Sequence, residues 1–270
     1  LLRKCIGCMS CNKEVVNHRG IRCAINPRLG RERDYNPAAL RRDGAGRCVP
    51  VIGGGPAGMQ AAIVLAERGF RPILFERRAY LGGSAVLASK APCKGLVAEY
   101  IETQKNQLAA LGVQVELNHA PTMAELRRLD PYGIFVAMGG QQIVPDIPGI
   151  DRENVFGIED VLLGRRAIEG REVAVIGGGH VGLEVAHFLC ANNKVTIVEM
   201  ADEIGASVYY ITKFKLLPML REAGVTFRTG QAIAAVDALR EQGAERLVFD
   251  VRNNGGGFLD ELTRLLDYLL

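Results

Sequence analysis

The sequence contains no segment that resembles a transmembrane helix. No apolar run approaches the roughly 18 residues that span a bilayer, and the first residues do not form a charged stretch followed by an apolar one, as a secretory signal does. We therefore expect no membrane association and a cytoplasmic location. The sequence also lacks a large excess of charge of one sign. The net charge is +3 over 270 residues, which is too small to indicate that the protein binds nucleic acid.

Cysteine pairs of the kind that form disulfides are absent from most of the chain. Cys48, Cys93 and Cys190 each stand alone in segments of strand or helix character, which predicts buried free thiols in a reducing compartment. A disulfide reductase needs two redox-active cysteines close together, and Cys93 has no such neighbour. The remaining composition, 48% hydrophobic and 23% charged, is typical of a globular chain with one large or two modest domains.

The beginning of the chain does carry a group of cysteines, at Cys5, Cys8, Cys11 and Cys23. The first three follow one another at intervals of three residues, and the fourth comes after eleven other residues. Thiolates at this spacing can converge on one metal centre, which predicts a 4Fe-4S cluster held by four cysteines. Zinc uses the same ligands and stays an alternative, as do cysteines that merely pack, although structural zinc sites more often have two separate cysteine pairs.

A connector follows the cysteines. Asn26–Arg47 is rich in Arg, Pro, Gly and Asn and has no sustained apolar period, which predicts an extended segment that crosses a surface. Two interpretations of its arginines stay open. They neutralise the charge of cofactor phosphates or of a cluster, or they are solvated side chains on a linker.

A Gly-rich loop comes next, between two apolar strands. Cys48–Ile52 and Pro72–Glu76 predict strands, and Met59–Arg68 has the apolar spacing of a helix. The loop before the helix carries a GxGxxG motif made by Gly53, Gly55 and Gly58. In a βαβ unit such glycines let the backbone approach a pyrophosphate, and the carboxylate that ends the second strand accepts from a ribose hydroxyl. Glu76 holds that last position, so the unit predicts a dinucleotide site.

The same unit occurs again further along the chain. Glu172–Ile176 and Lys194–Glu199 predict strands, and Leu183–Cys190 predicts the helix between them. The matching loop and strand-end residues are Gly177, Gly179, Gly182 and Glu199. Two dinucleotide sites in one chain predict a flavin and a nicotinamide that meet. His180 lies within the second loop, where a solvent-facing role is a simpler interpretation than a phosphate contact.

Together, these motifs resemble the iron–sulfur flavoenzymes related to old yellow enzyme, a family that includes NADH:flavin oxidoreductases, 2,4-dienoyl-CoA reductase and trimethylamine dehydrogenase. The four cysteines, both Gly-rich units and the stretches FERRAYLGGSA, VAMGG and VEMADEIG carry the resemblance, which runs from about Leu2 to about Thr229. It implies an α/β fold with two Rossmann-like domains of the glutathione reductase type, preceded by a small cysteine-rich iron–sulfur segment. The implied division is an iron–sulfur segment and connector over 1–47, an FAD domain over 48–148, an NAD(H) domain over 149–230 and an atypical tail over 231–270.

The resemblance also implies the cofactors and their residues. FAD falls at Gly53, Gly55, Gly58 and Glu76, with Gly82, Gly83 and Gly139 nearby. NADH falls at Gly177, Gly179, Gly182 and Glu199, and the 4Fe-4S cluster at Cys5, Cys8, Cys11 and Cys23. In this family FMN and the substrate belong to a β/α-barrel that precedes the cluster. We therefore expect a piece of a larger enzyme, or a chain that works with a barrel-bearing partner.

The tail departs from the family pattern. Family members continue into a strand with an ATG-like end and a Gly-Asp segment that complete the FAD domain, but this sequence has no Gly-Asp dipeptide. Gln231–Leu270 instead resembles a strand, Gly loop and helix of the C-terminal processing serine peptidases, and the alternative is a strand, an Asn-Gly turn and an amphipathic capping helix. We expect an open edge in the FAD sheet, weak retention of FAD, and association with another chain or a second copy.

These features predict an NADH:flavin oxidoreductase module that passes electrons between NADH, FAD and the cluster and serves a barrel that reduces enoate or enoyl-type small molecules. Hydride transfer needs alignment more than an acid or a base, so we nominate no catalytic side chain. Three alternatives stay open. They are an amine dehydrogenase-like module with reversed electron flow to an external acceptor, a non-catalytic scaffold that binds nucleotides and a cluster, and a peptidase, for which no serine–lysine pair is found.

Overall fold

The computed structural model describes residues 3–36, 38, 40–140, 152–230 and 246–249. The chain divides into two compact units at residue 140. Within the described residues, no helix is both long enough and apolar enough to cross a membrane.

The first unit begins with the cysteine segment and the connector. These contain two short helices, α1 (Ser10–Val16) and α2 (Glu32–Tyr35), and otherwise no regular structure among their described residues. The connector is therefore largely irregular, as its composition predicts.

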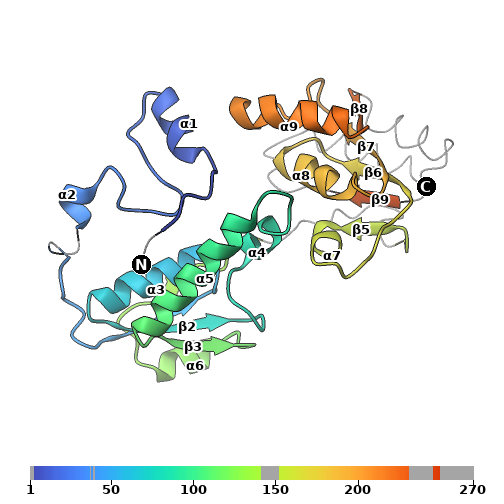
Figure 1. The fold of residues 1–270 in the computed structure, drawn as a ribbon. Helices are drawn as coiled ribbons and strands as arrows, with labels where there is room; N and C mark the ends of the chain where they lie inside the picture. Colours follow the sequence, from blue (N-terminus) through green and yellow to red (C-terminus); the bar gives the residue numbers. More distant parts are fainter. Residues whose placement is uncertain (1–2, 37, 39, 141–151, 231–245, 250–270) are drawn as a thin grey trace. The chain divides into compact units, whose positions relative to one another are not determined.

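A parallel sheet of four strands forms the centre of the first unit (Figure 1). Its strands lie in the order β3-β2-β1-β4, and every neighbouring pair is parallel. Their bounds are β1 Cys48–Ile52, β2 Arg71–Glu76, β3 Gln114–Leu117 and β4 Phe135–Val136. Because all strands run the same way, the Gly-rich loop after β1 and the carboxylate that ends β2 meet at one edge of the sheet.

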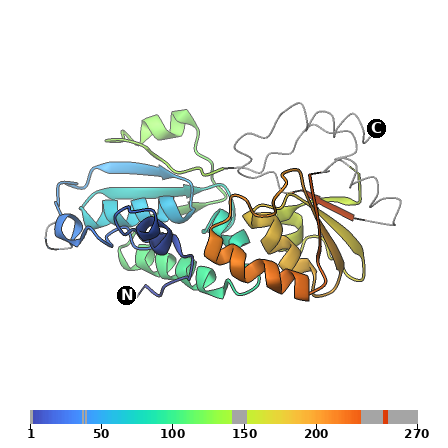
Figure 2. The ribbon, with the colours of Figure 1, turned by 90° about the horizontal axis from the view of Figure 1, so that it is seen from above.

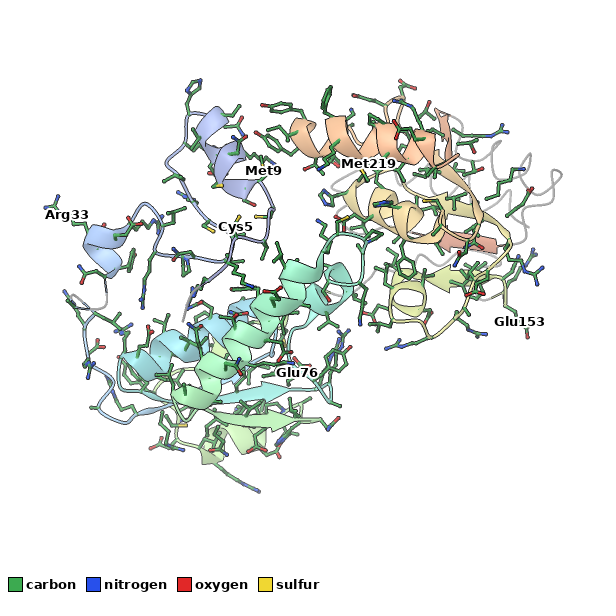
Figure 3. The ribbon with its side chains drawn as sticks, viewed as in Figure 1. Cys5, Met9, Arg33, Glu76, Glu153 and Met219 are labelled. Carbon is green, nitrogen blue, oxygen red and sulfur yellow. The ribbon has the colours of Figure 1, made fainter. Side chains whose placement is uncertain are left out.

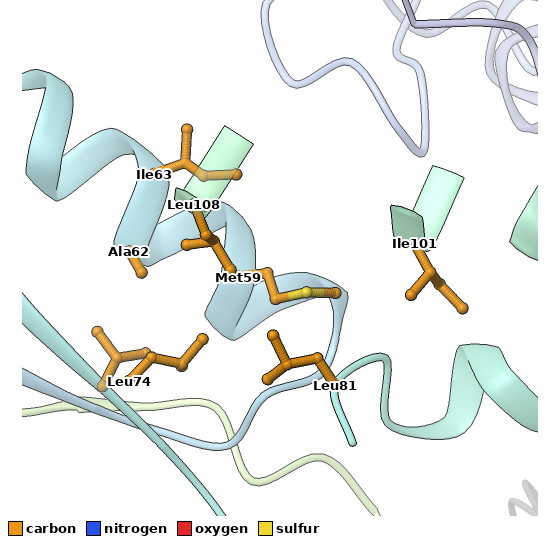
Figure 4. Packing of buried hydrophobic residues seen from close by; sticks show 8 residues of the cluster. Met59, Ala62, Ile63, Leu74, Leu81, Ile101 and Leu108 are labelled. Carbon is orange, nitrogen blue, oxygen red and sulfur yellow. The ribbon is translucent and has the colours of Figure 1, made fainter. Parts of the chain in front are cut away.

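Helices cover both faces of this sheet. Figures 1 and 2 show α3 and α5 side by side on one face and α6 on the other. The helices are α3 Pro56–Glu67, α4 Ser84–Ala88, α5 Gly95–Ala110 and α6 Met123–Arg128. The core follows the alternation of the strands, since Val51 and Leu74 pack against α3 and α5 (Figure 4), whereas Ile73 and Phe75 pack against Leu126 of α6.

Strand β4 is an edge strand in the described part of the first sheet. It pairs with β1 on one side only, and its Phe135 and Val136 are 46% and 61% exposed. An edge strand with apolar side chains offers unpaired backbone groups and an apolar surface. The open edge expected for the FAD sheet stays a prediction, because residues 141–151 and 231–245 lie outside the described residues.

The second unit is built on a parallel sheet of five strands. Its order is β5-β9-β6-β7-β8, with parallel pairing throughout. The strands are β5 Val155–Gly157, β6 Glu172–Ile176, β7 Lys194–Glu199, β8 Thr226–Thr229 and β9 Arg246–Phe249, and the helices are α7 Ile158–Leu162, α8 His180–Leu189 and α9 Tyr210–Glu222. Residues Val173–Ile176 of β6 are all buried, as in a parallel sheet covered on both faces.

One strand of this second sheet comes from the tail. Strand β9 lies between β5 and β6, so the expected strand of the tail forms part of the second unit. The Gly loop and the helix expected after it lie outside the described residues.

The sequence located the strands around both Gly-rich loops correctly, but it started both helices too late. The helices begin at Pro56 and His180, three residues before the predicted starts at Met59 and Leu183. The reason is that the last glycine of each motif belongs to the first helical turn, where proline also fits because its missing N–H would have no partner there.

The prediction that the three single cysteines are buried thiols holds for Cys48 only. Cys48 is buried, Cys190 is half-buried, and Cys93 is exposed. Cys93 lies in the turn between α4 and α5 with φ of 62°, so it belongs to a surface turn rather than to a packed element.

The core around α3 and α5 generates a stability prediction. Leu74 is fully buried, so Leu74→Ala should lower the free energy of unfolding by about 3 kcal/mol through lost apolar contacts and a residual cavity. Chemical denaturation followed by circular dichroism measures this change. Leu117→Ala is the matched control, because that side chain is 40% exposed, and an equal loss in both variants would contradict the assignment of the core.

Candidate dinucleotide-binding sites

The first Gly-rich loop is shaped by close backbone contacts. Gly53 has φ of 107° and lies against the backbone of Ala137 and Met138. A Cβ on Gly58 would overlap the carbonyl oxygen of Gly53, so α3 can approach the end of β1 this closely only without a side chain. The loop therefore needs glycine at both ends of the motif.

Glu76 holds this loop from the end of β2 (Figure 3). Its Oε2 accepts a hydrogen bond from the backbone N–H of Gly54 at 2.7 Å, and its Oε1 accepts one from the N–H of Arg78 at 2.8 Å. The side chain is only 6% exposed. The carboxylate thus organises the loop through both of its oxygens.

Three further predicted glycines lie on segments that border the first loop. The N–H of Gly82 donates to the carbonyl of Gly54 at 2.8 Å. Gly83, with φ of 52°, lies so close that a Cβ there would be 3.0 Å from Cα of Gly55. Gly139, with φ of 66°, follows the Ala137–Met138 segment that lies against Gly53.

The second loop repeats this geometry in the other unit. Gly177 has φ of 108°, and a Cβ on Gly182 would overlap the carbonyl oxygen of Gly177. Glu199 Oε2 accepts from the N–H of Gly178 at 2.6 Å, while its Oε1 accepts from the N–H of Ala201 at 2.9 Å. The second carboxylate therefore has the same role in its loop as the first.

The repeat extends to residues that sequence reasoning missed. The N–H of Gly205 donates to the carbonyl of Gly178 at 2.9 Å, just as Gly82 does to Gly54. The buried side chain of Ile204 lies beside Gly178 in the way that Leu81 lies beside Gly54. The signal was the spacing, because an apolar residue and a glycine follow each strand-ending glutamate at the same two positions.

The helices after both loops offer unsatisfied N–H groups to a ligand. Gly55 and Gly179 precede α3 and α8 and provide no side-chain cap, and neither helix has an acidic residue in its first turn. The first N–H groups of a helix have no partner within it, and the helix dipole adds positive potential there. Each helix start can therefore receive the pyrophosphate of a dinucleotide.

The two loops differ in how open they are. Gly55 is approached by Gly83, whereas a Cβ on Gly179 would meet nothing within 4 Å. His180 is exposed, as predicted, but its Nε2 lies 2.8 Å from Glu184 Oε1. The imidazole is therefore held along the first turn of α8.

The cysteine segment shows some features of a metal site. The N–H of Gly7 donates to Cys5 Sγ at 3.3 Å, and Gly7 and Met9 both have φ near the left-handed region, at 68° and 58°. Cys5 and Cys8 are exposed, while Cys11 and Cys23 are half-buried. No group of three or more His, Cys, Asp or Glu side chains converges as a metal site in the described residues. Four soft thiol ligands and an N–H···S bond suit an iron–sulfur cluster chemically, but the structure does not bring the four sulfurs together.

The open geometry at Gly179 generates a binding prediction. Gly179→Ala should leave the fold intact, because a methyl group has room there, yet it should weaken NADH binding at least tenfold by occupying the space of the pyrophosphate. Fluorescence titration of NADH measures the affinity. Gly133→Ala, also without close neighbours, is the control, and equal affinities in both variants would place the nucleotide elsewhere.

The site geometry agrees with comparisons with known proteins. The family model for pyridine nucleotide-disulphide oxidoreductases matches residues 48–257. NADH oxidase of Thermoanaerobacter brockii is 36% identical over 241 residues, which cover 87% of this chain and 37% of that protein. Cinnamate reductase of Clostridium sporogenes is 35% identical over 205 residues, which cover 75% of this chain and 30% of that protein.

A solved structure adds to this similarity. A 2-naphthoyl-CoA reductase in complex with 2-naphthoyl-CoA matches with a TM-score of 0.77 and 26% identity, over 90% of this chain and 39% of that chain. The present chain thus spans less than half the length of these relatives. The matched range includes both Gly-rich loops and strand β9. The chain belongs to the pyridine nucleotide-disulphide oxidoreductase family, as an FAD- and NAD(P)-binding oxidoreductase module.

Proposed function

We propose that this chain passes electrons between NADH, FAD and a 4Fe-4S cluster and serves an FMN-bearing barrel that reduces enoate-type small molecules. The observation that carries the proposal is the duplication of the loop. Each unit has a Gly-rich loop held by a carboxylate and followed by an uncapped helix. One such loop is typical of any dehydrogenase, whereas two in one chain require two dinucleotides.

Burial and openness support FAD at the first loop and NADH at the second. Glu76 is nearly inaccessible and Gly83 lies against Gly55. Glu199 is half-buried, and Gly179 is open. A covered loop suits a cofactor that stays bound through many turnovers, whereas an open loop suits a cosubstrate that must leave after each one.

The cysteine segment is proposed to hold the cluster through Cys5, Cys8, Cys11 and Cys23. The hydrogen bond from the N–H of Gly7 to Cys5 Sγ supports this assignment, because hydrogen bonds to the sulfurs stabilise thiolate ligands and tune the cluster potential. When bound, the groups together would supply hydride transfer from nicotinamide to flavin and single-electron transfer through the cluster.

The protein side chains hold and align these groups and take no chemical part of their own. Glu76 and Glu199 fix the loops through backbone N–H groups, and the helix starts receive the phosphates. Hydride transfer between two rings depends on their distance and orientation rather than on a proton donor. The mechanism therefore needs no catalytic acid or base, and the two glutamates act only by holding the loop backbone.

The relatives support the proposed substrate class, since one of them is a cinnamate reductase. NADH oxidase and cinnamate reductase are longer proteins of which this chain matches 37% and 30%. We therefore assign substrate reduction to the barrel, in the same polypeptide or in a partner chain. The electrons would reach its FMN from the cluster.

A spectroscopic experiment tests the function directly. The purified chain, supplied with FAD, should bind it, show flavin absorption that NADH bleaches without oxygen, and contain about four iron and four sulfide, as a 4Fe-4S cluster requires. Cys8→Ser should remove the iron and keep the flavin signal, whereas Cys93→Ser, at an exposed single cysteine, should keep both. Stoichiometric zinc without iron, or a flavin that NADH does not bleach, would contradict the proposal.

Cofactor choice at the second site gives a further prediction. We expect NADH to bind more tightly than NADPH, because the Glu199 carboxylate at the end of β7 would repel a 2′-phosphate by about 1 to 4 kcal/mol, or roughly tenfold to several-hundredfold in affinity. Glu199→Gln should reduce the difference in affinity between NADH and NADPH. The control is Glu222→Gln, which makes an equal charge change at the exposed end of α9 and should leave this difference unchanged. Equal affinities in the unmodified chain would show that Glu199 does not face the ribose.

A further inference from the structure

Gln104 is a polar side chain in the apolar core of the first unit. It lies on α5 between Ile101 and Leu108, and both of these belong to the core cluster that also contains Met59 of α3 (Figure 4). Gln104 itself is 0% exposed. An amide at such a position loses its hydrogen bonds to water, so it lowers stability unless the protein replaces each of them.

The protein replaces these hydrogen bonds only in part. Gln104 Nε2 donates to the carbonyl oxygen of Pro56 at 3.0 Å. Gln104 Oε1 is buried and accepts no hydrogen bond from the described residues. Since a carbonyl oxygen can only accept, this contact also fixes which end of the amide faces Pro56. The amide thus makes one contact and leaves one buried acceptor unsatisfied, which the stability of the fold alone does not favour.

The contact lies at the start of α3. Pro56 is the first residue of this helix, and its carbonyl belongs to the same peptide group as the N–H of Ala57. The first N–H groups of a helix have no partner within it. A hydrogen bond to a carbonyl oxygen polarises the peptide group and makes its N–H a stronger donor. Gln104 therefore anchors the first turn of α3 to α5 and strengthens an N–H group at the place where the pyrophosphate is received.

The second unit shows what the fold itself needs at this position. Helix α9 lies between β7 and β8 in sequence, as α5 lies between β2 and β3. The N–H five residues further on donates to the carbonyl of Leu220 at 2.9 Å and to that of Leu108 at 3.0 Å, and both leucines are buried. Four residues before Leu220 stands Leu216, where the first unit has Gln104. The same arrangement of strands and helices therefore accepts leucine at this position.

We propose that Gln104 is a positioning residue of the flavin site, which holds and polarises the first turn of α3 for the pyrophosphate of FAD. The inference rests on the proposed assignment of FAD to the first loop. Gln104 acts through the backbone of Pro56 and Ala57 rather than on the reacting atoms. Because the other unit has leucine at the matching position, we assign the amide to cofactor binding and not to stability.

The test uses the full chain and three variants, Q104L, Q104M and Q107L. Q104L introduces the residue that the second unit has, and Q104M removes the amide with an unbranched side chain of similar length. Q107L is the control, because it makes the same change on α5 at an amide that accepts from Arg3 instead of donating to α3. Fluorescence titration gives the affinities for FAD and NADH, urea unfolding without FAD gives the stability, and phosphorus NMR of bound FAD reports on its two phosphates.

We expect Q104L and Q104M to weaken FAD binding roughly two- to tenfold, as the loss of one neutral hydrogen bond does, and to shift the phosphorus resonances of bound FAD. Their urea midpoints should equal that of the unmodified chain or exceed it, because an unsatisfied acceptor leaves the core. The affinity for NADH should stay the same, since the second loop is unchanged. Q107L should match the unmodified chain in FAD affinity and phosphorus resonances.

Two kinds of result would overturn the inference and leave the proposed function intact. Unchanged FAD affinity and phosphorus resonances in Q104L and Q104M would show that the flavin site does not use the amide. A lower urea midpoint with unchanged phosphorus resonances, or failure of both variants to fold, would show that the amide serves the core alone. If only Q104L fails to fold, Q104M decides. Failure of the unmodified chain to bind FAD would instead refute the proposed function, and this inference with it.

Discussion

The close approach of a helix to the end of the preceding strand is the constraint on which both units depend. At Gly58 and Gly182 the helix touches the carbonyl of the first motif glycine, and no side chain fits between them. The two strand-ending carboxylates then fix the turn by accepting from backbone N–H groups. Each loop is thus fixed by glycine sterics and one buried or half-buried acid, which leaves the helix N-terminus free for phosphate.

Duplication makes the differences between the units informative. A carboxylate, an apolar residue and a glycine recur at the same spacing from the end of β2 and of β7. In the first loop, Gly83 lies against Gly55 as well, whereas nothing lies within 4 Å of a Cβ built on Gly179. The same backbone design therefore occurs once with a covered loop and once with an open one. The cysteine segment is attached by different means, through polar side chains that reach α5, so its position depends on individual residues rather than on backbone packing.

The features that could be predicted from the sequence are those that depend on residues close together in the chain. Apolar strands next to a Gly-rich motif identified β1, β6 and the strand-ending glutamates, because each depends on neighbours in sequence. Helix starts were placed too late, since the last motif glycine lies inside the helix. Gly205 was missed although it follows Glu199 at the same spacing as Gly82 follows Glu76. The spacing of the cysteines suggested a common metal, but spacing does not determine where four sulfurs lie in space.

Strand order in the second sheet has a consequence for how the protein is made. Strand β9 lies between β5 and β6, although more than 60 residues separate it from β6 in the sequence. While the ribosome is still extending the chain, β5 and β6 have no partner between them, and the sheet stays split until residue 249 has emerged. Pairings between distant segments form slowly and expose apolar strands meanwhile. The second sheet therefore leaves two of its strands without their shared partner for much of the synthesis of this chain.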